Sequence, residues 1–336
     1  MREAMLWEGL EDNEVRCDLC RHRCRIKAGR RGVCGVRENR DGRLFTLVYD
    51  RVAAEGVDPI EKKPFFHFLP GTLAYSIATM GCNFHCLHCQ NSGLSRTPAD
   101  TGTIQGYPRS PEEIVEAARA RGCRSISYTY SEPTVFAELA LDTAEKARAA
   151  GLKNTFVTNG YQSPELLRAM EGLVDAANVD LKSFSREFYH RVCGADLEGV
   201  LDTLRRLHAS GVWIEVTTLL IPGMNDGAEE LKELARFIAD LSPDIPWHVS
   251  RYHPAYKMHG PPPTPRETLD AARRIGREAG IKYVFSGNVP GDPGEHTYCH
   301  ACGAVLIERW GFAVRALRLR EGACPECGTP AAVRLD

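Results

Sequence analysis

The sequence predicts an α/β fold, a partial TIM barrel of about six to seven parallel strands with a small four-cysteine module at each end. From residue 73 onward, strand-like and helix-like segments alternate, which is typical of a parallel sheet with crossover helices. Glycine follows four of the helical segments directly before a strand, as helix carboxyl ends prefer: Gly122, Gly151, Gly211 and Gly280. We therefore expect three parts, at residues 1–70, 71–292 and 293–336.

Composition and charge are ordinary for a globular protein: 43% of the 336 residues are hydrophobic, 26% are charged, and the formal net charge is -2. No apolar stretch is long enough for a signal-peptide core or a membrane span, so we expect a cytoplasmic protein without a membrane partner. The charge does not exclude a nucleic-acid partner. Because cytoplasmic thiols stay reduced, the 13 cysteines are better explained by metal binding than by disulfides.

The first part carries the pattern Cys17-x2-Cys20-x3-Cys24-x9-Cys34. Four thiols can close a tetrahedral zinc site or hold a complete second iron-sulfur cluster. The spacing does not decide between them, and zinc is slightly favoured. Residues 36–70 are expected to form short strands and loops, with one strand over 43–49 and no chemistry.

The barrel elements follow in order. The predicted strands are 73–79, 125–130, 154–158, 177–181, 213–220, 248–252 and 283–286. The predicted helices are 111–120, 133–149, 163–169, 186–192, 197–209, 228–239 and 265–278. Cys123 and Cys193 belong to no group and are expected to be buried core thiols.

The loop after the first barrel strand reads Cys82-x3-Cys86-x2-Cys89. Four thiolates normally hold a [4Fe-4S] cluster, so three neighbouring cysteines leave one iron open to another ligand. A structural zinc site and a loop of reduced thiols are the competing interpretations.

Polar residues follow the other strands, at the barrel face where loops carry function. They include Ser131, Glu132, Asn159, Asp180, Lys182 and His253. An isolated Ser, Asn or Asp is more often a turn former or a helix cap, but together these residues predict a polar rim around one mouth.

Two C-x2-C-G knuckles end the chain and predict a zinc ribbon, with a hairpin between them over residues 304–319. The expected ligands are Cys299, Cys302, Cys324 and Cys327. We expect the ribbon to be structural or to serve as a docking module.

The pattern C-x3-C-x2-C resembles the signature of the radical S-adenosylmethionine (SAM) superfamily, and C-L-H-C-Q-N resembles the version found in glycyl-radical-enzyme activases. The resemblance implies that Cys82, Cys86 and Cys89 bind a [4Fe-4S] cluster that cleaves SAM to a 5′-deoxyadenosyl radical. It places His88 near the adenine, and Ser131 and Glu132 near the SAM amino group, although relatives carry Gly-Gly where Tyr130 and Ser131 stand. The T-N-G and D-x-K segments would hold the ribose and the carboxylate through Asn159, Asp180 and Lys182.

Nearly the whole chain is similar to the radical SAM component of the AmmeMemoRadiSam system, a group related to pyruvate formate-lyase activating enzymes. The matching segments are G-V-C-G-V-R-E-N, Y-S-E-P-T, T-N-G-Y, D-L-K-S, L-I-P-G-M-N-D and F-S-G-N-V-P-G. The resemblance implies an electron donor such as flavodoxin or ferredoxin and, as partners, Memo-like and AMMECR-type proteins.

Three functions follow from this resemblance. The first is a radical SAM enzyme that abstracts hydrogen from an unidentified substrate. The second is an activase that installs a glycyl radical on a partner protein. The third is a non-catalytic metal-binding interaction module.

The sixth predicted strand offers candidate residues for substrate contact. Period-2 alternation predicts His248 and Tyr252 on one side and Val249, Arg251 and His253 on the other. A histidine satisfied by a backbone carbonyl is an equally common role. We expect His248 or His253 to lie in the cavity beside the 5′ carbon of SAM.

Overall fold

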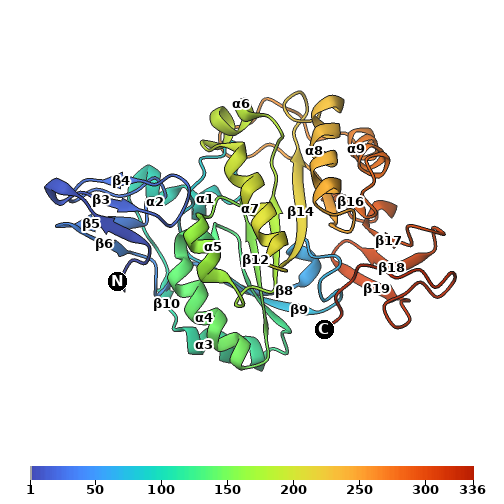
Figure 1. Cartoon of the computed structure of the whole chain (residues 1–336), viewed down its shortest axis with the longest axis horizontal. Helices are drawn as coiled ribbons and strands as arrows, with labels where there is room; N and C mark the ends of the chain where they lie inside the picture. Colours follow the sequence, from blue (N-terminus) through green and yellow to red (C-terminus); the bar gives the residue numbers. More distant parts are fainter. Residues whose placement is uncertain (1) are drawn as a thin grey trace.

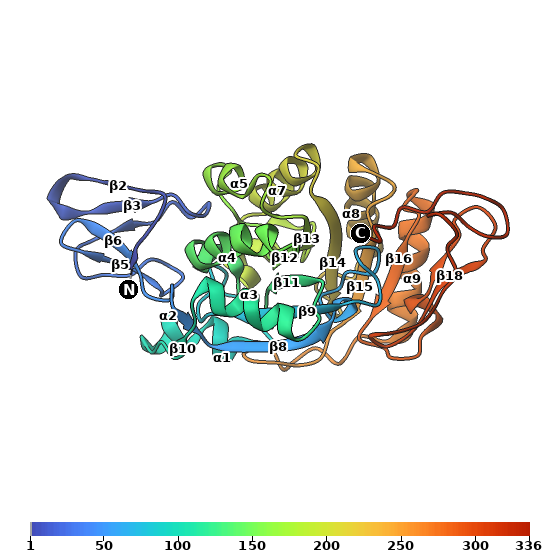
Figure 2. The ribbon, with the colours of Figure 1, turned by 90° about the horizontal axis from the view of Figure 1, so that it is seen from below.

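The computed structural model describes residues 2–336 and contains a central eight-stranded sheet in the order β16-β15-β14-β13-β12-β11-β9-β8. Seven strands are parallel: β9 (Leu73–Ala78), β11 (Ser125–Tyr128), β12 (Lys153–Thr158), β13 (Ala176–Asp180), β14 (Trp213–Leu220), β15 (Trp247–Arg251) and β16 (Val284–Gly287). The strands follow one another along an open curve between the two ends of the molecule (Figure 2). The predicted partial barrel is confirmed.

The crossover helices cover the outer face of the sheet, and several of them begin at a side-chain cap. Ser110 and Glu113 form a reciprocal capping box at α3, and Ser163 and Asp196 cap α5 and α7. The helices are α3 (Pro111–Ala120), α4 (Ala137–Ala149), α5 (Pro164–Met170), α6 (Arg186–Phe188), α7 (Leu197–Ala209), α8 (Ala228–Leu241) and α9 (Arg266–Glu278). The predicted helix over 186–192 is a short α-helix that continues as a π-helical turn over Tyr189–Cys193.

The eighth strand, β8 (Ala54–Pro59), pairs antiparallel with β9 at the edge of the sheet. It lies before residue 70, so the barrel sheet begins earlier in the chain than the predicted boundary. A single strand that pairs with the edge of a sheet has only a short alternating pattern in the sequence. Residues 54–59 were therefore predicted to belong to the irregular segment before the barrel.

Residues 60–71 follow β8 and close the amino end of the barrel. Ile60, Phe65, Phe68 and Leu69 pack against Ala74 of β9 and Ala176 of β13, on the face opposite the helices. Asn178 donates from Nδ2 to the carbonyl oxygen of Pro64 at 2.8 Å. We call residues 60–71 the floor segment.

The amino-terminal module contains two small antiparallel sheets. One is formed by β1 (Arg2–Glu3), β6 (Arg43–Thr46) and β5 (Arg37–Arg40), and the other by β2 (Trp7–Gly9), β3 (Val15–Cys17) and β4 (Arg25–Ile26). A separate two-stranded pair joins β7 (Arg51–Val52) and β10 (Tyr107–Pro108). The expected strand over 43–49 ends at Thr46. A buried ion pair of 2.5 Å between Arg37 and Glu138 fastens this module to α4.

The carboxyl-terminal ribbon consists of β17 (Thr297–Tyr298), β18 (Val305–Trp310) and β19 (Ala313–Leu317). Strands β18 and β19 form the predicted hairpin. Figure 1 shows the amino-terminal module and the ribbon on opposite sides of the barrel. In the described part of the chain, no helix has the length and apolar character needed to span a membrane.

Candidate active site

The cysteine loop leaves the carboxyl end of β9 and is held by backbone hydrogen bonds to the π-helical turn. His85 N donates to Cys193 O at 2.7 Å, and Leu87 N donates to Val192 O at 3.0 Å. After the loop the chain forms two short helices, α1 (Ser92–Ser95) and α2 (Thr97–Thr101). The loop therefore has a fixed path at the mouth of the barrel.

The three thiols of the loop are shielded from solvent, with Cys86 buried and Cys82 and Cys89 half-buried. Two N–H groups point toward the sulfur of Cys82: the backbone amide of Phe84 at 3.3 Å and Nδ2 of Asn159 at 3.7 Å. Donors aimed at a sulfur favour its charged form, which is the form that binds metal.

The protein environment acts differently on the three thiol pKa values. Burial raises the pKa of Cys82 well above its usual value, and the Glu132 charge adds to this effect. Burial also raises the pKa of Cys89. A hydrogen bond from the Cys193 thiol lowers the pKa of Cys86, and the positive charge of Lys182 contributes in the same direction. Cys193 is a buried core thiol, as the sequence predicts, and it also adjoins Cys86 of the site.

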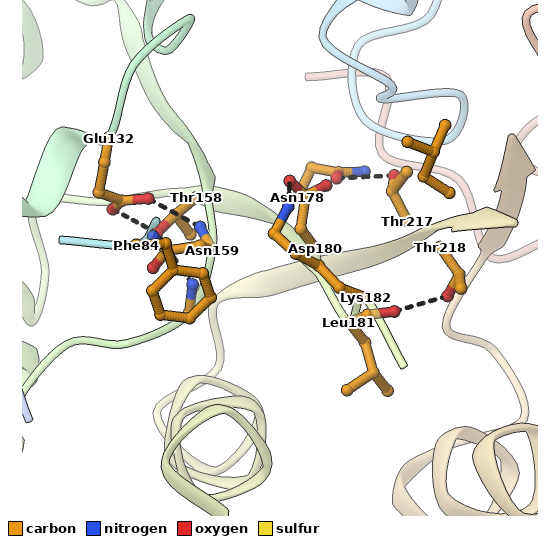
Figure 3. Close-up of polar contacts among 12 residues, drawn as sticks. Phe84, Glu132, Thr158, Asn159, Asn178, Asp180, Leu181, Lys182, Thr217 and Thr218 are labelled. Carbon is orange, nitrogen blue, oxygen red and sulfur yellow. Dashed lines mark hydrogen bonds and ion pairs between the residues drawn. The ribbon is translucent and has the colours of Figure 1, made fainter. Parts of the chain in front are cut away.

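Glu132 is buried, and both oxygens of its carboxylate accept hydrogen bonds from neighbouring residues (Figure 3). Oε1 accepts from the Thr134 amide at 3.0 Å, the Thr134 hydroxyl at 2.6 Å and the Thr158 hydroxyl at 2.7 Å. Oε2 accepts from the Asn159 amide at 2.8 Å. Burial raises the pKa of Glu132 despite these bonds. Glu132 thus holds the loop after β12, and the placement of Ser131 and Glu132 near the SAM amino group stays a prediction.

Asn159 is the residue that this network positions. Its Nδ2 donates to Asn83 Oδ1 at 2.7 Å, beside Cys82. The loop after β12 is therefore joined directly to the cysteine loop. The prediction that Asn159 lies at the site agrees with this position.

Asp180 and Lys182 stand at the carboxyl end of β13, and their side chains form an ion pair of 2.8 Å (Figure 3). The side chain of Lys182 is 16% exposed, so most of it is buried behind the mouth. The charges of Asp180 and of Cys86 raise the pKa of Lys182 even though burial lowers it. Lys182 therefore supplies a permanent positive charge beside the cysteine loop.

Ser131 and Tyr130 form hydrogen bonds with residues on both sides of the cysteine loop. Ser131 Oγ donates to Thr79 O at 2.7 Å, and Asn91 Nδ2 donates to Tyr130 O at 2.8 Å. Tyr130 has a φ of 62°, in the left-handed region that favours glycine.

The Tyr130 side chain compensates for this backbone strain. Its hydroxyl donates to Asp58 at 2.5 Å, and the Lys63 ammonium lies 4.1 Å from its ring centre. Lys63 also pairs with Asp58 at 2.7 Å, and burial lowers the pKa of Lys63 to about 8. No chemistry was predicted for Asp58 and Lys63, because only the fold brings them to Tyr130.

His88 is buried near the ring of Phe188, with 6.2 Å between ring centres. Burial and the nearby charge of Lys182 lower its pKa to about 3, so its ring is neutral. Among residues 2–336, His88 Nδ1 and Asn83 Nδ2 are two of the buried polar atoms that lack a hydrogen-bond partner. Both flank the cysteine loop.

The structure separates the histidines predicted for substrate contact. His248 is buried at the amino end of β15, where its Nε2 bonds with Glu215 at 2.6 Å and its ring stacks on Phe285. It belongs to the barrel floor, so its predicted contact beside SAM is not supported. Strand β15 ends at Arg251. Tyr252 lies just beyond it and is buried, with its hydroxyl donating to Met258 O at 2.8 Å. His253 is exposed just beyond the strand, and its role stays a prediction.

The two sets of four cysteines also come together in space. Cys17, Cys20, Cys24 and Cys34 line one apolar cavity between the amino-terminal module and the barrel. Cys299, Cys302, Cys324 and Cys327 form a compact group whose sulfur atoms all lie within 4.8 Å of one another.

Known proteins resemble this chain over most of its length. A family model described as the radical SAM superfamily matches residues 76–238. The uncharacterized protein MJ0808 of Methanocaldococcus jannaschii is 48% identical over 331 residues, which cover 98% of each chain. The pyruvate formate-lyase 1-activating enzyme of Escherichia coli K12 is 22% identical over 220 residues, covering 61% of this chain and 89% of that enzyme. The chain belongs to the radical SAM superfamily.

A solved structure extends the comparison. A domain of a pyruvate-formate lyase-activating enzyme from Bacteroides vulgatus aligns with a TM-score of 0.44 at 20% identity, covering 49% of this chain and 99% of that domain. The predicted radical SAM resemblance is confirmed by the family match and the sequence relatives.

Radical SAM membership implies an enzyme with a [4Fe-4S] cluster and SAM, and the residues at the mouth fit both groups. Three thiols on one short loop suit a cluster with one open iron. The unpartnered Nδ1 of His88 and Nδ2 of Asn83 offer polar contacts to a ligand beside that loop. Lys182 provides positive charge for a carboxylate.

Proposed function

We propose that this radical SAM enzyme cleaves SAM at the barrel mouth and abstracts a hydrogen atom from a substrate that enters there. The observation that carries the proposal is the convergence of the three loop thiols with Lys182 and the Asn83–Asn159 pair. When bound and reduced, the cluster supplies the one electron that breaks the sulfonium bond of SAM.

The residues of the mouth divide the work of binding and positioning. Cys82, Cys86 and Cys89 hold the cluster, and the Lys182 ammonium meets the SAM carboxylate while Asp180 orients it. Asn159 contacts the bound SAM, and Glu132 positions Asn159 through its backbone amide. Ser131 fixes the strained turn at Tyr130, and the neutral ring of His88 faces the adenine.

The ribbon holds zinc in this proposal. Cys299 Sγ and Cys327 Sγ are 3.6 Å apart, as are Cys302 Sγ and Cys324 Sγ. A tetrahedron with Zn–S bonds of about 2.3 Å has edges of about 3.8 Å, which matches these distances. The electron donor is a low-potential protein such as flavodoxin or ferredoxin, and Memo-like and AMMECR-type proteins are candidate partners.

A second candidate function is the activation of a glycyl-radical enzyme. It is favoured by relatives whose names describe that activity, including the Escherichia coli enzyme and a putative activating enzyme of Methanocaldococcus jannaschii that is 24% identical over 181 residues. Mixing this protein, SAM and a reductant with a glycyl-radical enzyme should then give a persistent glycyl radical in electron paramagnetic resonance. A non-catalytic role would not need the complete cysteine loop.

Anaerobic reconstitution followed by reduction tests the main proposal. The wild type should convert SAM to 5′-deoxyadenosine, and Cys82→Ala, Cys86→Ala and Cys89→Ala combined should reduce the product to background. Formation of 5′-deoxyadenosine by the triple variant would contradict the assignment.

A separate binding measurement tests Lys182. Lys182→Ala should weaken SAM binding by roughly ten- to a hundredfold, since a charge-assisted contact is worth about 1.5–3 kcal/mol. Lys232→Ala, which removes an exposed lysine paired with Glu229 on α8, is the matched control and should leave the affinity unchanged.

A further inference from the structure

The amino-terminal cysteines surround a cavity that differs from the zinc-like site of the ribbon. Cys17, Cys20 and Cys34 are buried, Cys24 is half-buried, and Leu19 and Ile26 line the same cavity. Within residues 2–336, these four thiols do not form a compact ligand group like that of the ribbon. Four thiolates on a single zinc must stand nearly in contact, whereas four thiolates on a cubane each bind a different iron and stand further apart.

The cysteine loop of the barrel provides an internal comparison. The sulfur atoms of Cys82, Cys86 and Cys89 likewise do not all lie within 4.8 Å of one another. The resemblance of this loop to the radical SAM signature implies that these three thiols hold a [4Fe-4S] cluster. Two of the three thiol sets in this chain thus share the wider spacing, and only the ribbon has the narrow one. All three sets offer only cysteine thiolates as ligands. The spacing of the sulfur atoms is therefore the feature that distinguishes a zinc site from an iron-sulfur site.

The cavity directly adjoins the cysteine loop through three contacts. His22 Nε2 donates to the carbonyl oxygen of Asn83 at 2.7 Å. His85 hydrogen-bonds to the backbone of Val33, next to Cys34. Gly81 approaches the module so closely that a Cβ atom there would lie 3.2 Å from Cys34 O. In each of the three contacts, both residues lie within two positions of a cysteine of their own set or are such a cysteine.

We infer that Cys17, Cys20, Cys24 and Cys34 hold a second iron-sulfur cluster, placed beside the barrel site for exchange of single electrons. The transfer involves no bond change: a low-potential electron-transfer protein loses one electron, the second cluster gains it, and then passes it to the barrel cluster. This electron-transfer role rests on the proposed function, whereas iron binding by these four thiols does not. The wider spacing of these four thiols in the structure favours iron over the zinc that was slightly preferred from the sequence.

The surface around the cavity fits such a donor. Lys27 and Arg30 are exposed on the segment that joins two of the ligands, Cys24 and Cys34, and the exposed Arg25 and Arg31 on the same segment pair with Glu14 and Glu38. A basic surface attracts an acidic partner and speeds its association, with an effect that falls as salt increases. The donor therefore has a docking surface next to the second cluster.

The experiment uses the full chain in three forms, reconstituted anaerobically with iron and sulfide and analysed for iron, zinc and paramagnetic resonance. The wild type should hold about eight irons and one zinc, because two cubanes and one ribbon site are present. The combined Cys82→Ala, Cys86→Ala and Cys89→Ala variant should keep about four irons, with a cubane signal on reduction. Adding Cys17→Ser and Cys20→Ser should remove these irons and leave the zinc.

Each outcome decides the inference. About four irons and two zincs in the wild type, with no iron in the triple variant, would overturn it. Retained zinc at the ribbon and unchanged circular dichroism show that a variant is folded, so loss of iron cannot be attributed to unfolding. The iron content of the triple variant does not depend on SAM cleavage, so failure of this inference and failure of the proposed function are distinguishable.

Discussion

The amino-terminal module and the carboxyl-terminal ribbon each carry four cysteines, but they attach to opposite ends of the barrel strands. The amino-terminal thiols are mostly buried, and the backbone and side chains of their module contact the cysteine loop at the carboxyl ends of the strands. The ribbon thiols include two exposed ones, Cys302 and Cys327, and the ribbon contacts the floor segment at the amino ends. In TIM-type barrels, catalytic residues lie at the carboxyl ends of the strands, and residues at the amino ends contribute to stability.

Arg309 of β18 makes the main contact between the ribbon and the floor. It is fully buried, lies 3.8 Å from Glu61, and donates to Phe66 O at 2.5 Å and to Thr297 Oγ1 at 2.9 Å. On the same floor, Glu215 accepts from the amides of Phe66 and His67. The ribbon is thus part of the barrel floor, which supports the structural role predicted for it over the docking role.

The largest effect that we expect comes from breaking this contact. Arg309→Met keeps the volume but leaves Glu61 and the Phe66 carbonyl without their partner, so the free energy of unfolding should fall by about 3–5 kcal/mol. Urea denaturation followed by circular dichroism measures this change.

The matched control lies on the same hairpin. Arg318 pairs with Glu308 at 2.5 Å, but both side chains are more than 40% exposed. Arg318→Met should therefore change stability by no more than about 0.5 kcal/mol. Equal effects of the two substitutions would contradict the role of Arg309 in the floor.

The next effect is a pH dependence specific to the floor. Burial raises the pKa of Glu61 from 4.5 to about 7, against the opposing charge of Arg309. A carboxyl group whose pKa is raised on folding adds stability below its unfolded pKa and loses that contribution as pH rises through its folded pKa. The advantage of the wild type over Glu61→Gln should therefore shrink between about pH 5 and pH 8, by up to about 3 kcal/mol.

Urea denaturation of both proteins at several pH values checks this prediction. His67 lies nearby, and burial lowers its pKa to about 4, but it is present in both proteins and its contribution cancels in the difference. Parallel stability curves for the wild type and Glu61→Gln would show that Glu61 does not titrate in this range.

The elements of the fold could be predicted largely from the sequence, because parallel strands and crossover helices leave strong local patterns. The predicted bounds of 213–220, 111–120 and 197–209 match β14, α3 and α7. β8 was missed because one hairpin strand depends on the edge it joins. The floor segment reads as a loop, since its contacts with β13 and β14 come from residues more than one hundred positions away.

Site residues could be predicted where a residue has a chemically suitable side chain and also directly follows a barrel strand. Cys82, Cys86, Cys89 and Lys182 meet this condition, and the structure brings them to one mouth. The place of His248 in the barrel floor could not be predicted, because alternation along a strand gives the face of the sheet and not the end of the strand. The roles of Cys193 and Lys63 could not be predicted, because each depends on a side chain from a distant element.

The smallest effect that we expect compares the two ends of the barrel directly through a pair of glycines. Gly81 faces the amino-terminal module with a φ of 105°, and a Cβ atom there would lie 2.7 Å from Val36 Cγ1. Gly71 faces the ribbon with a φ of 78°, and its Cβ would lie 3.5 Å from Val314, an ordinary contact. Both Gly→Ala changes carry the strain of a positive φ, so their difference isolates the close approach to the module.

Gly81→Ala should therefore destabilise the protein by about 1–3 kcal/mol more than Gly71→Ala, because overpacking forces Val36 or the backbone to shift. Urea denaturation of the two variants measures the difference, and iron content after reconstitution provides an independent measurement. Only Gly81→Ala should lower the iron content, since it alone separates Cys34 from the cysteine loop. If both glycines behave alike in both measurements, the amino-terminal module is not seated against that loop as tightly as the structure indicates.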